Sequence, residues 1–257
     1  MSVVEMICLA ASAATAGAIN AVAGGGTLVT FPTLLFFGTS PVVANASSTL
    51  ALVIGTGGSV YGYRRHLESV KPWLWRFLPV SILGGLIGSA LLTGTSDRVF
   101  SKMVPFLILF ATLLFLVQGI VRRFIGFDGS ASGQKPNRIW IAVVFQFAVA
   151  IYGGYFGAGI GILMLASLGF VGLSNIHEMN TLKTVLGSLI NLVAAIWFIA
   201  AGLIHWPKAG IMTLGALVGY YLGSYYSQRI PQKYVRYLIT AIGFTISAIT
   251  FYKEFLR

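Results

Sequence analysis

Two groups of glycine and polar residues in this chain have the types and spacing needed to bind a small anion. The glycines are Gly24–Gly26 and Gly159–Gly161, and nineteen residues after each group comes an asparagine, Asn45 or Asn180. Glycine lets backbone N–H groups approach an oxyanion closely because it has no Cβ, and amides and hydroxyls donate hydrogen bonds to its oxygens. These residues predict recognition of an anion.

The helices that carry these residues are expected to lie in a lipid bilayer. The chain has 257 residues, of which 57% are hydrophobic and 9% are charged. A soluble domain has about 25% charged residues, so disorder and an ordinary soluble enzyme are excluded. The net charge of +11 does not indicate nucleic-acid binding, because basic residues of membrane proteins cluster in short loops and set topology.

The second half of the sequence repeats the first half at an offset of 135 residues. At this offset Asn45 falls on Asn180 and Thr49 on Thr184. Further identities at the same offset are Gly26 with Gly161, Pro72 with Pro207, Gly84 with Gly219 and Gly88 with Gly223. Repeated matches at one offset indicate a duplication.

Each half is predicted to contain one long apolar segment followed by three transmembrane helices. The long segments are 5–37 and 139–173, and the helices are 43–63, 73–94, 99–121, 180–204, 208–228 and 234–252. A straight helix over residues 5–37 would be about 50 Å long, whereas the hydrocarbon layer is about 30 Å thick. Because consecutive glycines are poor helix formers, we expect each long segment to break there and turn back as a helical hairpin.

The predicted fold class is therefore all-α, a polytopic membrane protein with transmembrane repeats 1–121 and 139–257. A basic linker, 122–138, joins them and is expected to be cytoplasmic. If each broken segment returns to its starting side, twelve of the 17 Lys and Arg residues gather on one side, and if it crosses once, eleven do. The positive-inside rule favours the first arrangement, which makes the repeats inverted, by one residue only, so parallel repeats stay open.

Inverted repeats with interrupted helices are a plan of secondary transporters, which bind substrate near the bilayer midplane. Half-helices that begin after Gly26 and near Gly161 would point N–H groups and positive dipole ends into one cavity. We predict backbone contacts to the anion from Gly25, Gly26, Thr27, Gly159, Ile160 and Gly161. We predict side-chain contacts from Asn45, Ser48, Thr49, Asn180, Lys183 and Thr184.

Structural roles compete with these predictions. Ser and Thr often bond between membrane helices, Asn45 and Asn180 can cap the helices that follow them, and Lys183 can extend to the interface. The pairs Gly84/Gly88 and Gly219/Gly223 have the spacing of packing motifs, within the monomer or at a homodimer interface.

Catalysis and metal binding have little support in the sequence. The acidic residues lie near segment ends and the three histidines lack metal-site spacing, so no enzyme, metal or cofactor is expected. An anion channel is the alternative to a carrier.

Longer motifs resemble a known family. Asn20-Ala-Val-Ala-Gly-Gly-Gly-Thr27 and Ala44-Asn45-Ala46-Ser47-Ser48-Thr49, with their second-half counterparts Gly157–Gly161 and Asn180–Thr184, resemble the TauE/SafE sulfite exporter family, also called the 4-toluene sulfonate uptake permease family. The resemblance covers about residues 5–252. It implies a carrier of the bacterial inner membrane that moves sulfite, sulfoacetate or taurine-like sulfonates, more commonly outward, with small carboxylates as an alternative substrate class. Many members have a lysine where this chain has Ser48, so Lys183 is the one lysine of this repeat-related pair of positions.

Overall fold

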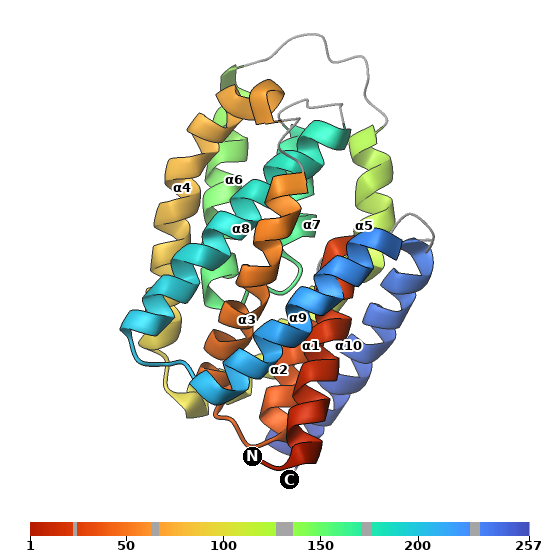
Figure 1. Ribbon diagram of the computed structural model, residues 1–257. Coiled ribbons are helices and arrows are strands. Elements are labelled where there is room, and N and C mark those ends of the chain that lie inside the picture. Colours follow the sequence, from red (N-terminus) through yellow and green to blue (C-terminus); the bar gives the residue numbers. More distant parts are fainter. Residues whose placement is uncertain (23–24, 63–66, 127–135, 171–175, 227–231, 257) are drawn as a thin grey trace.

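The protein is built entirely of helices within the residues that the computed structural model describes, which are 1–22, 25–62, 67–126, 136–170, 176–226 and 232–256 (Figure 1). Ten helices occur in these residues. They are α1 (Val3–Val22), α2 (Thr27–Phe36), α3 (Pro41–Gly62), α4 (Leu67–Thr93), α5 (Asp97–Gly126), α6 (Pro136–Tyr155), α7 (Ile160–Phe170), α8 (Ile176–Ala200), α9 (Trp206–Tyr226) and α10 (Gln232–Phe255).

The helices have the lengths and compositions of a multi-pass membrane protein. In the described part of the chain, α1, α4, α5, α8 and α10 are each long and apolar enough to cross a bilayer, and α2, α3 and α6 contain shorter apolar stretches. The prediction of an all-helical, polytopic membrane protein is confirmed. Both long apolar segments are interrupted near their glycines, between α1 and α2 and between α6 and α7.

The predicted linker is shorter in the structure than residues 122–138. Helix α5 continues to Gly126, and α6 begins at Pro136, so the chain is helical at both ends of the predicted linker. Proline suits the first position of a helix because its φ is already helical and its missing N–H is not needed there. Residues 127–135 lie outside the described residues, as does Gly24 of the first glycine group.

Contacts at one end of the molecule define the directions of the helices. Both chain termini lie at this end, which we call the terminal end (Figure 1). Lys208, near the start of α9, forms a partly buried ion pair with Glu5 of α1 (Nζ to Oε1, 2.9 Å) and donates to the carbonyl oxygen of Phe37 after α2 (2.8 Å). Asp97 at the start of α5 accepts a hydrogen bond from the N–H of Val42 at the start of α3 (3.0 Å).

The two hairpins therefore enter the molecule from different ends. The start of α1 and the end of α2 meet at the terminal end, so the α1–α2 hairpin begins and finishes there. The α6–α7 hairpin begins and finishes at the opposite end (Figure 1). The first residues of α2 and α7 consequently lie in the interior.

Each hairpin is packed against a helix from the other half of the chain, α1 against α9 and α6 against α4. Small residues allow this close approach. In the α1–α9 pair the contacts repeat every four residues and run in the same direction along both helices. Gly215, Gly219 and Gly223 of α9 face Ala10, Ala14 and Ala18 of α1, in that order. A Cβ on Gly219 would overlap the carbonyl oxygen of Ala14, and one on Gly88 of α4 would overlap that of Ile151 in α6. Both glycine motifs are thus used inside the monomer.

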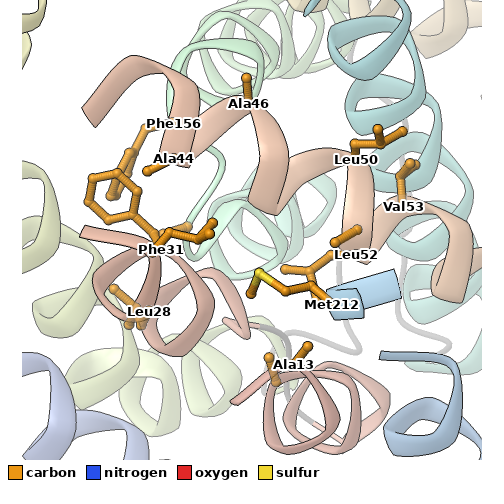
Figure 2. Packing of buried hydrophobic residues seen from close by; sticks show 14 of the residues in the cluster. Ala13, Leu28, Phe31, Ala44, Ala46, Leu50, Leu52, Val53, Phe156 and Met212 are labelled. Atoms are coloured by element: carbon orange, nitrogen blue, oxygen red, sulfur yellow. The ribbon is translucent and has the colours of Figure 1, made fainter. Parts of the chain in front are cut away.

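Aromatic rings join the two hairpins inside the larger of two buried apolar clusters, which Figure 2 shows in part. The ring of Phe156, directly after α6, lies 5.5 Å from that of Phe31 in α2, and both contact the ring of Phe100 in α5. Edge-to-face pairs of this kind add to the free energy of burial. The smaller cluster is formed by α4, α6, α7 and α8.

The close approach of α1 and α9 predicts different outcomes for two Gly→Ala changes on the same helix. Gly219→Ala is expected to lower stability by about 2 kcal/mol, because the added methyl group overlaps the backbone of α1. Gly210 has open space around its Cα, so Gly210→Ala should be neutral or stabilise by about 0.5–1 kcal/mol through the unfolded chain. Thermal unfolding in detergent checks this, and equal melting temperatures would contradict the described packing.

Candidate functional site

The first interruption is held by a side chain from the end of α1. Gly25 has φ +98°, a conformation that favours glycine. The Oδ1 atom of Asn20 accepts a hydrogen bond from the N–H of Gly26 (2.7 Å), and its Nδ2 donates to the hydroxyl of Tyr220 in α9 (2.9 Å). Asn20 therefore pairs one of the N–H groups that the start of α2 would leave without a partner.

At the second interruption a different residue supports the backbone by a similar hydrogen bond. Gly157 and Gly159 have φ values of +82° and +78°. The hydroxyl of Tyr152 in α6 donates a hydrogen bond to the carbonyl oxygen of Ala158 (2.7 Å). In both halves the supporting side chain lies six residues before the backbone group that it binds.

The ring of Phe115, a buried side chain of α5, lies between the two interruptions. A Cβ on Gly25 would overlap this ring, and a Cβ on Gly159 would lie 3.7 Å from its Cε2 atom. The interruptions of the two halves, which are more than a hundred residues apart in the sequence, therefore contact the same side chain. An aromatic ring thus lies beside both interruptions in this conformation.

Helix α8 brings a cation and an amide to the second interruption. The Cδ atom of Lys183 lies 3.3 Å from the position of a Cβ on Gly161, so the lysine stem packs directly against the first turn of α7. The Oδ1 atom of Asn191 lies 3.6 Å from the corresponding position on Gly157. The stem of a lysine is thus close to the positive end of the α7 dipole.

The predicted side chains of the first half have protein partners. The hydroxyl oxygens of Ser48 and Thr30 are 2.6 Å apart, and both side chains are buried. Thr49 donates to the carbonyl oxygen of Asn45 (2.9 Å). The Nδ2 of Asn45 donates to the carbonyl oxygen of Tyr155, the last residue of α6 (3.1 Å). Ser48 and Lys183 occupy repeat-related positions but face different surroundings.

The alternative in which Asn45 and Asn180 cap their helices is wrong. Helix α3 begins at Pro41 and α8 at Ile176, so both asparagines lie inside helices. At the start of α3 the carboxylate of Asp97 accepts the hydrogen bond from Val42. The helices begin earlier than predicted, and Pro41 is suited to the first helical position.

The remaining predicted residues lie on the same elements. Thr27 begins α2, and Ile160 begins α7 and is buried. Asn180 and Thr184 lie in α8 and are partly buried. In the described part of the chain, no group of three or more His, Cys, Asp and Glu side chains is placed to hold a metal ion.

Sequence reasoning missed the residues that support the interruptions. Asn20, Tyr152, Tyr220, Phe115 and Asn191 have no identical residue at the 135-residue offset. A search for repeated identities therefore passes over them. The one available signal was the place of Asn20 inside the motif that ends in Gly24–Gly26.

Sequence comparison relates the chain to known membrane proteins. The profile of the family described as "Sulfite exporter TauE/SafE" matches residues 9–250. A "Probable membrane transporter protein" of Haemophilus influenzae is 27% identical over 238 residues, covering 92% of this chain and 90% of the relative. "Probable membrane transporter protein YfcA" of Escherichia coli is 26% identical over 243 residues, covering 92% and 86%. "Probable membrane transporter protein ORF9" of Sinorhizobium sp is 27% identical over 246 residues, covering 90% and 87%. No solved structure matches the chain.

The hydrogen bonds around Asn20 predict unequal effects of two adjacent tyrosine changes. Tyr220→Phe removes the partner of Asn20 and should lower stability by about 1 kcal/mol, and Asn20→Leu by about 2 kcal/mol because it also leaves the N–H of Gly26 unpaired. Tyr221 is exposed, so Tyr221→Phe is the matched control and should change stability by less than about 0.5 kcal/mol. Hydrogen exchange over residues 25–30 should accelerate in Asn20→Leu, and unchanged exchange would remove Asn20 from this role.

Proposed function

The chain belongs to the sulfite exporter TauE/SafE family, whose members are membrane transporters and not enzymes, and from this premise we propose that it carries a small sulfur-containing anion. The proposed substrates are sulfite and organosulfonates such as sulfoacetate or taurine. The proposed location is the inner membrane of a bacterium, and the proposed direction is export.

One observation carries this proposal: the interruptions of both halves contact the ring of Phe115. The helices that start there, α2 and α7, direct their N-terminal ends toward a common region inside the protein. Helix N-termini attract anions through the positive end of the helix dipole, and at the start of α2 this is the main contribution, because the N–H of Gly26 is already bonded to Asn20. The charge of Lys183 beside Gly161 strengthens the attraction, because a cation in a region of low dielectric interacts strongly with an anion.

The directions of the helices support inverted repeats. Helices α1 and α9 run parallel from the terminal end, as the order of their facing Gly and Ala residues requires. The repeat-related pair, α6 and α4, also runs parallel, because Gly84 faces Ala150 and Gly88 faces Ile151, and it starts from the opposite end (Figure 1). Two such pairs of opposite direction match the plan of inverted-repeat carriers.

The proposed mechanism is alternating access around the two interruptions. In this proposal the present conformation is a closed state, because the ring of Phe115 lies against both Gly25 and Gly159. Substrate entry then requires this ring to move, and relative motion of the two apolar clusters would open the space to one side of the membrane at a time.

Counterflow in proteoliposomes tests the substrate class and the role of Lys183. The wild type is expected to exchange sulfite or a sulfonate with saturation, and Lys183→Met should weaken the apparent affinity by about tenfold or more through loss of a charged contact. Lys71 is exposed and lies 3.9 Å from Glu68, so Lys71→Met serves as the control and should keep the wild-type affinity. Flux that never saturates would identify a channel, and equal affinity of both variants would remove Lys183 from the site.

The closed position of Phe115 predicts a substrate-dependent change in its accessibility. The chain has a single cysteine, Cys8, so Phe115→Cys can be studied in a Cys8→Ser background. We expect a small anionic thiol reagent to modify this cysteine, and we expect taurine, a sulfonate that does not consume the reagent, to slow the reaction, because both compete for one space. Phe77→Cys, at a buried position of α4 in the other cluster, should stay unmodified. If the cysteines at positions 115 and 77 react equally fast and the substrate slows neither reaction, a substrate space at Phe115 is contradicted.

A further inference from the structure

We infer that the anion carried by this protein bears a hydrogen-bond donor of its own, and that Oδ1 of Asn45 accepts the hydrogen bond from this donor. The inference rests on the proposed function and adds the chemical form of the substrate. Three forms fit: a monoprotonated oxyanion such as hydrogensulfite, a hydroxyalkyl sulfonate, and a sulfonate with an ammonium group. They share an O–H or N–H donor next to anionic oxygens.

Asn45 holds a buried acceptor atom that nothing in the described protein satisfies. Its side chain is 1% exposed, and its Nδ2 donates to the carbonyl oxygen of Tyr155. Its Oδ1 has no hydrogen-bond partner among the described residues. An acceptor buried in this way loses its hydrogen bonds to water without replacement, which is costly for a marginally stable protein.

The orientation of this amide is determined by its partner. A backbone carbonyl can only accept, so the nitrogen of Asn45 must face Tyr155 and the oxygen must point elsewhere. The other buried acceptor without a partner among the described side chains is Oε1 of Gln146. The Nε2 of Gln146 lies 3.1 Å from the hydroxyl oxygen of Ser81. A hydroxyl can donate as well as accept, so the amide of Gln146 can flip and let its oxygen accept a hydrogen bond from Ser81.

The position of Asn45 connects this acceptor to the substrate region. Tyr155 ends α6 two residues before Gly157, so the amide lies at the second interruption. A bare oxyanion presents only acceptors and would be repelled by Oδ1. An anion with a donor pairs this atom and still leaves its charged oxygens for Lys183 and the helix N-termini. A site with an acceptor of this kind rejects an analogue that lacks the donor, since the acceptor is then left unpaired.

Isethionate and ethanesulfonate test the inference, because they have the same charge and similar size and differ by one hydroxyl group. Counterflow of each is measured in proteoliposomes at one pH with no sodium present. The wild type should carry isethionate about tenfold more efficiently than ethanesulfonate, the ratio expected for one unpaired buried acceptor. Asn45→Leu, of nearly the same shape, should bring the ratio close to one. Gln146→Leu removes the other buried amide and should keep the wild-type ratio.

The outcomes separate this inference from the proposed function. Equal transport of the two sulfonates by the wild type, or an unchanged ratio in Asn45→Leu, overturns the inference while the proposed function stands. The assay is then repeated with sodium, and equal transport of the two sulfonates that appears only with sodium also overturns the inference. If Asn45→Leu does not fold, the wild-type ratio decides.

Counterflow of sulfite is also measured, because the protein can carry sulfite and neither of the two sulfonates. If sulfite is carried and neither sulfonate is, the rate with equal pH on both sides should fall from mildly acidic to mildly alkaline pH, as hydrogensulfite loses its proton. A rate independent of pH overturns the inference. Absence of counterflow with every sulfur anion is a failure of the proposed function itself.

Discussion

Pairing of backbone groups inside the bilayer is the constraint on which the rest of this structure depends. Lipid offers no partner to an N–H or a carbonyl group, so a helix can stop at membrane depth only where the protein supplies one. Asn20 supplies an acceptor to Gly26, and Tyr152 supplies a donor to Ala158. These contacts make the two interruptions parts of the buried interior, where they can present a helix end to a substrate without exposing unpaired backbone to lipid.

The same constraint explains why the hairpin of each half packs against a helix of the other half. A hairpin that turns back inside the membrane needs close neighbours, and helices rich in small residues provide them because their backbones approach without side chains between. Helix α9 of the second half covers α1, and α4 of the first half covers α6. Each half therefore completes the packing of the other half's hairpin. The hairpin ends then contact one side chain, Phe115, rather than lying in two separate bundles.

The two interruptions do not have equivalent surroundings. Lys183 of α8 packs against the first turn of α7, whereas Ser48 at the repeat-related position is hydrogen-bonded to Thr30 of α2. Asn45 of the first half binds the end of α6 in the second half. A lysine of α8 thus lies at the second interruption, and an amide from the other half lies at the same place.

The sequence by itself determined the class of protein, the approximate helices and the positions of both interruptions. It could do so because bilayer thickness limits the length of an apolar helix, and because consecutive glycines and a repeat at one offset are visible without any contact. It also predicted Lys183 and Gly161 as site residues, and the structure brings these two residues into contact, while their role at a site stays a prediction. Only the tertiary structure decided that Phe115 lies between the interruptions, that Asn20 and Tyr152 support them, and that the amide nitrogen of Asn45 is already taken. These facts depend on which helices become neighbours and in what register, and hydropathy and spacing along the chain carry no record of either.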